Sequence, residues 1–244
     1  MNVVRTVRER EAAYRALPAV IELCRCWTYE EFYSRVDRLS NALLDRGIRK
    51  GDVLLCWLPN IREALETELA CLQIGVVWVT LNSGLTWPEV ELVVRATEPL
   101  AVVVHSELAP RIRLDRGETR QVFERAAKIV AGSPVASLQP AESYENAIES
   151  ASRVTPDIGI TESDTARLRY TSGTTGRAKA AILSHRVYLG SLRNLREHLH
   201  PLDSTDRVLH AAPLTHASGA LAYPILAAGG ANVILPAFDA ERVL

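Results

Sequence analysis

The stretch that decides the fold is Tyr170–Lys179, which reads Tyr-Thr-Ser-Gly-Thr-Thr-Gly-Arg-Ala-Lys. Its hydroxyl groups and backbone N–H groups can turn toward one bound anion, and Lys179 adds a point charge. Glycine lets the backbone approach a ligand closely. We therefore interpret this stretch as a loop that binds phosphate groups. A surface loop without a ligand is the alternative.

The spacing within the loop excludes a Walker A site. That pattern needs Gly-x4-Gly-Lys-Ser/Thr, whereas Gly173, Gly176 and Lys179 are each three positions apart and no Ser or Thr follows the lysine. The chain also has no Gly-x-Ser-x-Gly turn. The adjacent Ser184 and His185 therefore do not indicate a hydrolase nucleophile.

Apolar runs of strand length alternate with helical repeats on both sides of the loop. Strands are expected over 20–26, 52–58, 76–81, 100–105, 166–170, 180–183 and 207–212. Capping boxes at Thr28 with Glu31 and at Thr86 with Glu89 predict where two helices begin. This order predicts an α/β fold, with a doubly wound and mostly parallel sheet plus the incomplete start of a second subdomain.

Two parts of the chain are less regular. The opening residues, to about Leu17, predict an exposed and charged helix. Between 106 and 164, helical patches are expected at 121–130 and 143–151. Neither part contains an identifiable chemical motif.

The composition restricts the class of partner and the compartment. The chain is 48% hydrophobic and 23% charged with a net charge of -1, so nothing in its charge favours nucleic-acid binding. Its 4 cysteines lack the paired spacing of a zinc site. Without a secretory signal, the sequence predicts a cytoplasmic location.

Residues 217–238 contain no charged residue and are long enough on paper to cross a bilayer. Pro224, the Gly229–Gly230 pair and Pro236 divide them into a short helix, a turn and a strand. We therefore predict no transmembrane segment.

Residues 170–179 resemble the phosphate-loop signature of the adenylate-forming (AMP-binding) superfamily. Its members include acyl- and aryl-CoA synthetases, peptide-synthetase adenylation domains and beetle luciferases. Residues 212–219, Ala-Pro-Leu-Thr-His-Ala-Ser-Gly, are similar to its histidine-bearing acyl-pocket motif. Thr28-Tyr-Glu-Glu31 and Leu58-Pro-Asn60 are similar to its early landmarks. The resemblance runs from about residue 20 to the end of the chain, on the acyl-CoA ligase branch.

The resemblance implies a two-step reaction. A carboxylic acid reacts with Mg2+-ATP to give acyl-adenylate and pyrophosphate, and coenzyme A then displaces AMP. The residues implied to bind the β- and γ-phosphates of ATP are Thr171, Ser172, Gly173, Thr174, Thr175, Gly176 and Lys179. Thr171 would also lie near the metal. His216 would be the catalytic histidine that lines the acid pocket; a strand-end histidine without a ligand is the alternative.

The loop departs from the family pattern at Ala178, where proline is usual, and at Ala180, where glycine is usual. An alanine at position 180 adds a methyl group beside a backbone for which the family pattern suggests glycine geometry, which puts the loop conformation in question.

The resemblance also predicts the domain organisation. Residues 48–205 would form the first α/β subdomain, and 1–47 with 206–244 would be pieces of an incomplete second one. The adenine-binding segment and the small C-terminal lid domain with its catalytic lysine would follow beyond 244, and Lys50, Lys128 and Lys179 cannot replace that lysine. This predicts a chain that is inactive alone.

Two alternatives to this interpretation stay open from the sequence. The chain can be a non-catalytic fragment or pseudoenzyme that at most binds nucleotide, or part of a peptide-synthetase adenylation module. The substrate acid is a small molecule of unspecified structure. A homo-oligomer is compatible with the sequence.

Overall fold

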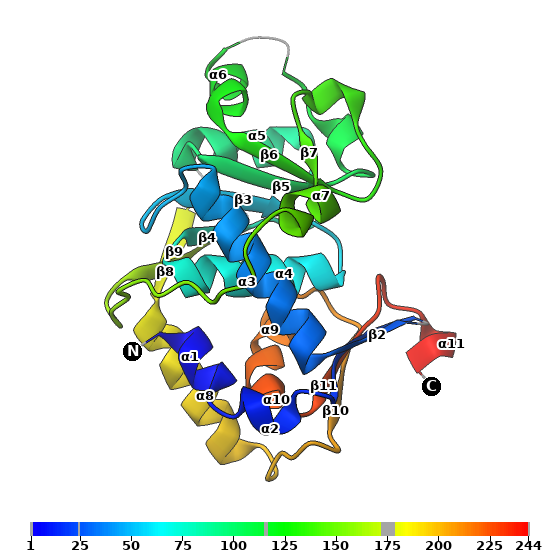
Figure 1. Ribbon diagram of the computed structural model, residues 1–244. Coiled ribbons are helices and arrows are strands. Elements are labelled where there is room, and N and C mark those ends of the chain that lie inside the picture. The colour runs from blue at the N-terminus through cyan, green and yellow to red at the C-terminus, as the bar shows by residue number, and fades with distance from the viewer. Residues whose placement is uncertain (1, 24, 115–116, 172–178, 244) are drawn as a thin grey trace.

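The computed structural model describes residues 2–23, 25–114, 117–171 and 179–243. Two sheets organise them, a large one in the upper part of Figure 1 and a small one at the lower right. The large sheet has the strand order β7-β6-β5-β3-β4-β8-β9. Its strands are β3 (Val53–Trp57), β4 (Val77–Thr80), β5 (Ala101–His105), β6 (Ala127–Ala131), β7 (Glu142–Ser143), β8 (Thr165–Thr171) and β9 (Lys179–Ser184).

Every described pairing in this sheet is parallel except that of β8 with β9. Alternate residues of β3 enter two apolar cores, with Leu54 on one side and Leu55 on the other. Side chains of α3 (Tyr29–Asp45), α4 (Arg62–Ile74), α7 (Tyr144–Glu149) and α8 (His185–His198) enter the first core, and those of α5 (Trp87–Thr97) and α6 (Glu118–Arg125) the second. Helices on both faces confirm the doubly wound α/β prediction.

Local signals set several helix ends as predicted. Both capping boxes are present, Thr28 with Glu31 at α3 and Thr86 with Glu89 at α5. Gly75 ends α4 with φ 73, a left-handed conformation that costs glycine little. Ser184 occupies the N-cap position of α8, but its side chain makes no cap hydrogen bond.

The small sheet has the order β10-β11-β1-β2 and so joins the two ends of the chain. Its strands are β1 (Pro18–Glu22), β2 (Arg25–Thr28), β10 (Arg207–His210) and β11 (Ala231–Ile234). The prediction of one strand over 20–26 is wrong, because the chain reverses at Leu23 (φ 46) and β2 pairs antiparallel with β1. No Gly, Pro or Asn marks this turn in the sequence.

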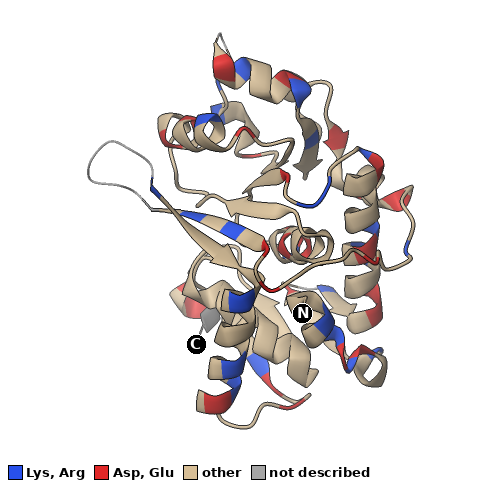
Figure 2. Cartoon of the chain, turned by 90° about the vertical axis from the view of Figure 1, so that its left-hand side faces the viewer, with Lys and Arg blue, Asp and Glu red and all other residues tan. Residues whose placement is uncertain are grey.

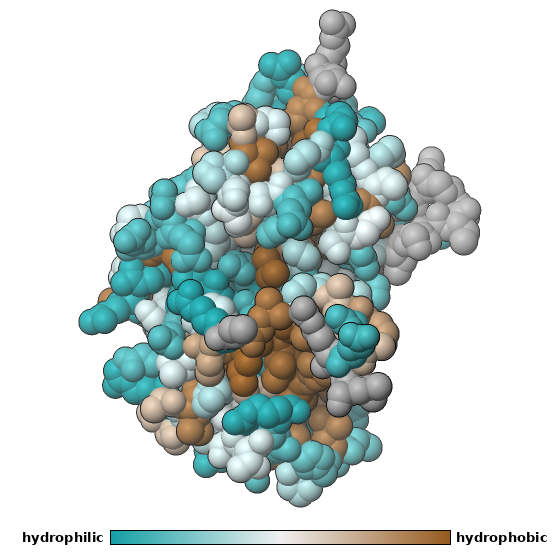
Figure 3. Space-filling view, turned by 90° about the vertical axis from the view of Figure 1, so that its right-hand side faces the viewer, coloured by the Kyte–Doolittle hydropathy of each residue, from teal (hydrophilic) through white to brown (hydrophobic). Residues whose placement is uncertain are grey.

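One face of the small sheet is incompletely covered. Leu209, Val233, Ile21 and Cys26 are register partners across its four strands. Leu209 and Cys26 are exposed, and the two between them are half-buried. Apolar side chains gather in the lower part of the face shown in Figure 3, the side on which Figure 1 places this sheet.

The irregular parts of the chain differ most from expectation. The helix predicted over 121–130 ends at Arg125, and Ala127–Ala131 is β6, because its apolar residues complete a parallel ladder with β5. The remaining short elements are the 3-10 turns η1 (Ala109–Arg111) and η2 (Ala136–Leu138) and helices α1 (Val3–Arg8), α2 (Glu11–Tyr14), α9 (Ala217–Ala220), α10 (Ala222–Ala228) and α11 (Ala240–Val243).

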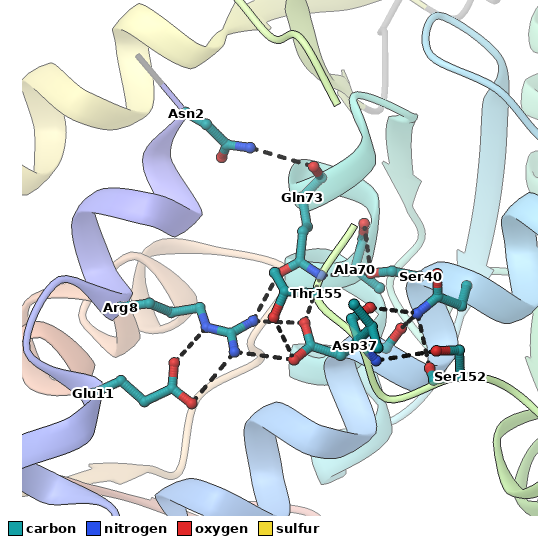
Figure 4. A network of polar contacts seen from close by, with 11 residues as sticks. Asn2, Arg8, Glu11, Asp37, Ser40, Ala70, Gln73, Ser152 and Thr155 are labelled. Atoms are coloured by element: carbon teal, nitrogen blue, oxygen red, sulfur yellow. Dashed lines mark hydrogen bonds and ion pairs between the residues drawn. The ribbon is translucent and has the colours of Figure 1, made fainter. Parts of the chain in front are cut away.

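The opening segment is not the exposed helix predicted. Helix α1 buries Val3, Val4 and Val7, and a polar network fixes it. Arg8 Nη1 donates to Asp37 Oδ1 at 2.7 Å and to the Gln73 side chain at 2.9 Å, as Figure 4 shows. Thr155 donates to the same aspartate at 3.0 Å. The network therefore ties α1, α3, α4 and the segment after α7 together.

Residues 217–238 form α9, α10 and β11, which confirms the predicted helix, turn and strand. Within the described ranges, no helix combines the length and apolar character that crossing a bilayer requires.

Candidate active site at the strand ends

The hairpin of β8 and β9 carries the candidate phosphate loop and stands at one side of the molecule in Figure 2. The ladder pairs Thr171 with Lys179, so the two outer residues of the predicted site face each other across the hairpin. The Lys179 side chain is exposed. The other predicted phosphate ligands, Ser172, Gly173, Thr174, Thr175 and Gly176, lie outside the described residues, as does Ala178.

Ala180 lies in a regular part of this hairpin, opposite Tyr170. Among the described residues other than glycine, only Leu23 and Glu98 have positive φ. Position 180 therefore does not adopt a left-handed conformation, and alanine fits its backbone. The conformational question that the sequence raised at this position does not arise.

The segment 211–216 follows β10 and brings His216 to the N-terminus of α9. Asn60, just beyond the end of β3, fixes this segment with both polar atoms of its carboxamide. Its Nδ2 donates to Ala212 O at 2.9 Å, and the Leu214 N–H donates to its Oδ1 at 2.8 Å. Asn60 thus satisfies two backbone groups in a loop, where neither helix nor strand can do so.

Two further contacts hold the same segment. Arg167 of β8 is 5% exposed, and its Nη2 donates to Thr215 O at 2.7 Å. On the other side, Gly219 lies so close to the turn that an added Cβ would be 2.1 Å from Leu214 O. Only glycine fits there without moving backbone. The three contacts come from Asn60 just beyond β3, from Arg167 in β8 and from Gly219 in α9, and they determine the path of residues 212–219.

His216 itself is exposed at the end of this fixed segment. Its Nδ1 lies 3.2 Å from the Thr215 hydroxyl, and its backbone N–H donates to Pro213 O at 3.0 Å. An exposed imidazole on a fixed backbone can contact a bound ligand and donate or accept a hydrogen bond. The described contacts do not place His216 against the candidate phosphate loop. The loop sequence follows the end of β8, and the His216 segment contacts β8 through Arg167.

The residues that support the site lie outside the motifs that carry the candidate ligands. Asn60 was a landmark without a role, and Arg167 had none at all. His210, the last residue of β10, belongs to none of the sequence motifs. It is buried, its Nδ1 lies 2.8 Å from Ser218 Oγ and its Nε2 lies 2.9 Å from Asn232 Oδ1. Burial lowers its pKa. The available signal was a pair of arginines, Arg167 and Arg169, inside a predicted strand.

The fit of ATP to this site rests on donor chemistry. Lys179 is exposed at the end of the hairpin, and a lysine together with the hydroxyl residues of the 171–176 sequence suits polyphosphate oxygens. Lys50 and Lys128 are held elsewhere: Lys50 pairs with Asp164 at 2.6 Å, and Lys128 donates to Phe123 O at 2.7 Å. Across the described ranges, no cluster of three His, Cys, Asp or Glu could hold a metal.

Comparison with known proteins gives consistent matches along the chain. A family model described as AMP-binding enzyme matches residues 7–244. The chain is 35% identical to a feruloyl-CoA synthase from an Amycolatopsis species, over 89% of this chain and 40% of that protein. It is 32% identical to an L-proline–[L-prolyl-carrier protein] ligase from Streptomyces coelicolor, over 79% of this chain and 35% of that protein.

Solved structures show the same fold. ATP-bound MatB from Rhodopseudomonas palustris superposes with a TM-score of 0.81 at 25% identity, over 99% of this chain and 46% of that one. The chain spans about 40% of the length of the curated feruloyl-CoA synthases that it matches.

Proposed function

This chain belongs to the AMP-binding enzyme family, and we propose that it supplies the ATP-phosphate-binding part of an acid–thiol ligase. In the proposed reaction a carboxylate oxygen attacks the α-phosphorus of ATP, forming a C–O–P bond as the bond to pyrophosphate breaks. The thiol sulfur of coenzyme A then attacks the acyl carbon and AMP leaves. The observation that carries the proposal is the hairpin that pairs Thr171 with Lys179 at the two ends of the family's signature loop.

The role proposed for the loop is electrostatic. Pyrophosphate gains charge as it leaves, and preorganised donors that face this charge lower the barrier. We assign the donors to Thr171, Ser172, Gly173, Thr174, Thr175, Gly176 and Lys179. Mg2+ would neutralise part of the same charge, and Thr171 is the residue we assign near it.

The role proposed for His216 is to line the place where the acid meets the α-phosphate. Three contacts to residues 212–219 support it, because a catalytic group must be held in position to act. The imidazole is exposed and can donate a hydrogen bond to a carboxylate or phosphate oxygen. We assign it no part in proton abstraction.

We make separate proposals for the thiol that accepts the acyl group and for the acid that is activated. The similarity to a feruloyl-CoA synthase favours coenzyme A and an aromatic acid. The similarity to a prolyl-carrier protein ligase supports a second candidate, an adenylation module that delivers the acyl group to a carrier-protein thiol. Incubating the complete enzyme and ATP with each acceptor distinguishes the two by the mass of the thioester.

We also propose that residues 48–205 and the combined 1–47 and 206–244 behave as two subdomains, in a cytoplasmic protein. The strands of the large sheet come from the first range and those of the small sheet from the second. One apolar core extends across both. Fractionation of cells followed by immunodetection tests the location.

The reaction is tested by incubating the complete enzyme with ATP, coenzyme A and a panel of aromatic and aliphatic acids. AMP and the matching acyl-CoA should accumulate together with at least one acid. AMP without thioester from any acid, or neither product, would count against the proposal. We also propose that the 244-residue chain alone does not turn over, because Lys50 and Lys128 are held elsewhere and cannot serve as the catalytic lysine that the family resemblance implies.

A further inference from the structure

A group of polar side chains, all buried except the half-buried Tyr188, adjoins the segment that carries His216. We call it the Arg167 cluster, and it consists of Glu68, Trp78, Arg167, Tyr188 and Tyr223. Arg167 and Glu68 are 5% and 4% exposed. Charged groups this deeply buried are rare and need compensating contacts. A cluster of this kind therefore calls for an explanation beyond core packing.

The contacts of the cluster hold the guanidinium in one orientation. Its Cζ lies 4.4 Å from the centre of the Trp78 ring, and Trp78 is the register partner of Arg167 in the neighbouring strand. Tyr188 of α8 donates to Glu68 Oε1 at 2.9 Å. Burial raises the pKa of the Glu68 carboxyl, and the positive charge of Arg167 opposes this effect. An indole face and a nearby carboxylate thus both stabilise the cation.

The Arg167 guanidinium also makes a contact outside the cluster, because its Nη2 donates to Thr215 O at 2.7 Å. Thr215 directly precedes His216. In the other direction along β8, Thr171 follows Arg167 by four residues, which is about 13 Å of extended strand. One side chain therefore connects the backbone next to His216 with the strand that leads into the phosphate loop.

A small cavity adjoins this connection. Its volume is about 10 Å3, and its lining includes Glu68, Trp78, Thr215 and Gly219. A space of this size holds one water molecule at most. The turn before His216 is therefore nearly close-packed against the cluster and can follow a displacement of Arg167.

Stability alone is a poor reason to bury these charges. Apolar residues of similar volume often replace a buried ion pair without loss of stability, whereas a fixed orientation is a role that buried charges serve well. Arginine suits that role because its guanidinium stays charged at all relevant pH values and presents donors in a rigid plane.

We infer that Arg167 is a positioning residue, which fixes the His216 segment relative to β8 while Glu68, Trp78 and Tyr188 hold its guanidinium in place. The inference rests on the proposed function, since it assigns Arg167 an effect on adenylation through His216. Because Arg167 is 5% exposed, we assign it no direct contact with substrate. Its effect should consequently disappear when His216 is absent.

The test is a double-mutant cycle in the complete enzyme, measured as acid-dependent ATP–pyrophosphate exchange. Arg167→Met should lower the adenylation rate about 10- to 100-fold, as expected for a displaced catalytic group. The KM for the acid should rise while the KM for ATP changes less than about 2-fold. When His216→Ala is already present, adding Arg167→Met should lower the adenylation rate by less than about a further 3-fold. If the rate loss of the double variant equals the product of the losses of the two single variants, the inference is overturned.

Two companion variants keep the test decisive if Arg167→Met folds poorly. Arg167→Lys retains the charge and should recover part of the rate, and Glu68→Gln should reproduce part of the loss. Arg193→Met removes an exposed arginine from α8 and serves as the matched control, with an unchanged rate. A loss of rate in the control equal to that of Arg167→Met would overturn the inference.

A spectroscopic readout separates this inference from the proposed function. In the complete enzyme with labelled histidine, the His216 ring signal should shift in Arg167→Met and stay in place in Arg193→Met. If the ring signal shifts but His216→Ala leaves the exchange unchanged, the positioning contact stands and the proposed role of His216 fails. If His216→Ala lowers the exchange and the ring signal does not shift, the inference fails and the proposed function stands.

Discussion

The backbone N–H of Leu214 donates to Asn60 Oδ1 across 2.8 Å, although 154 positions separate the two residues in sequence. The same carboxamide donates back to Ala212 O at 2.9 Å. A residue at the end of β3 in the large sheet thus determines the path of the chain after β10 in the small one. The segment that carries His216 therefore depends on contacts between both sheets.

Asn60→Ala should lower the free energy of unfolding by about 1 to 3 kcal/mol, because it leaves the N–H of the buried Leu214 and the carbonyl of Ala212 without their partner. Urea unfolding followed by circular dichroism measures this. Asn60→Asp keeps the acceptor for the Leu214 N–H and should therefore lose less stability than Asn60→Ala. Asn194→Ala, on the exposed side of α8, is the control and should change the value by less than about 0.5 kcal/mol. Equal losses at positions 60 and 194 would contradict the assigned contact.

Gly219→Ala should destabilise the protein by about 1 to 3 kcal/mol and lower adenylation in the complete enzyme, because the new methyl group would displace the turn at Leu214. Gly190→Ala is a matched control within α8, where an added Cβ meets nothing within 4 Å. It should stabilise the protein by about 0.5 to 1 kcal/mol. Thermal melting of both variants gives the comparison. An unchanged melting temperature in Gly219→Ala would contradict the close contact between Gly219 and Leu214 O.

Glu22 gives the stability a dependence on pH that is opposite to that of most carboxylates. Its carboxylate accepts the Arg62 N–H at the start of α4, and burial raises its pKa from 4.5 to about 7. The folded state thus binds a proton that the unfolded state lacks between pH 4.5 and 7, so this contribution is complete below 4.5 and is lost as pH rises through 7. Relative to Glu22→Gln, the protein should lose roughly 1 to 3 kcal/mol over this range. A pH-independent difference between the two would rule the effect out.

His185 gives the stability a dependence on pH that is opposite to that of Glu22. It is fully buried at the start of α8, and neither ring nitrogen has a hydrogen-bond partner in the described part of the chain. Burial lowers its pKa from 6.5 to about 4. Between these values the unfolded state binds the additional proton, so stability falls as pH decreases. His185→Leu should reduce the acid-induced loss by up to about 3 kcal/mol, measured by urea unfolding at pH 7 and pH 4. An unchanged acid sensitivity would refute the assignment.

The sequence predicted those features that local patterns determine. The capping boxes at Thr28 and Thr86 and the alternation of strands and helices depend on neighbouring residues, and each has a physical signature. Strand β6 was missed because its sequence, Ala-Lys-Ile-Val-Ala, continues the helical pattern of α6, and only pairing with β5 decides it. The turn at Leu23 has no conformational signal in its residues.

The candidate site divides in the same way. The candidate phosphate loop and His216 lie in short motifs, so the sequence is enough to propose them. Their supports, Asn60 and Arg167, act across large sequence separations, 48 positions for Arg167 to Thr215. Such contacts depend on the packing of two sheets and have no signature in a single sequence. Arg167 also stands where a strand pattern favours an apolar residue, and tertiary contacts with Trp78 explain its presence.

The central claim is that residues 171–179 hold the phosphates of ATP during activation of a carboxylic acid. It is tested most directly by acid-dependent ATP–pyrophosphate exchange in the complete enzyme, comparing the wild type with Lys179→Ala and Lys179→Arg. The account predicts exchange only when a suitable acid is present, a loss of about 10-fold or more in Lys179→Ala, and a smaller loss in Lys179→Arg. Exchange that is unaffected by removal of the Lys179 side chain would contradict it.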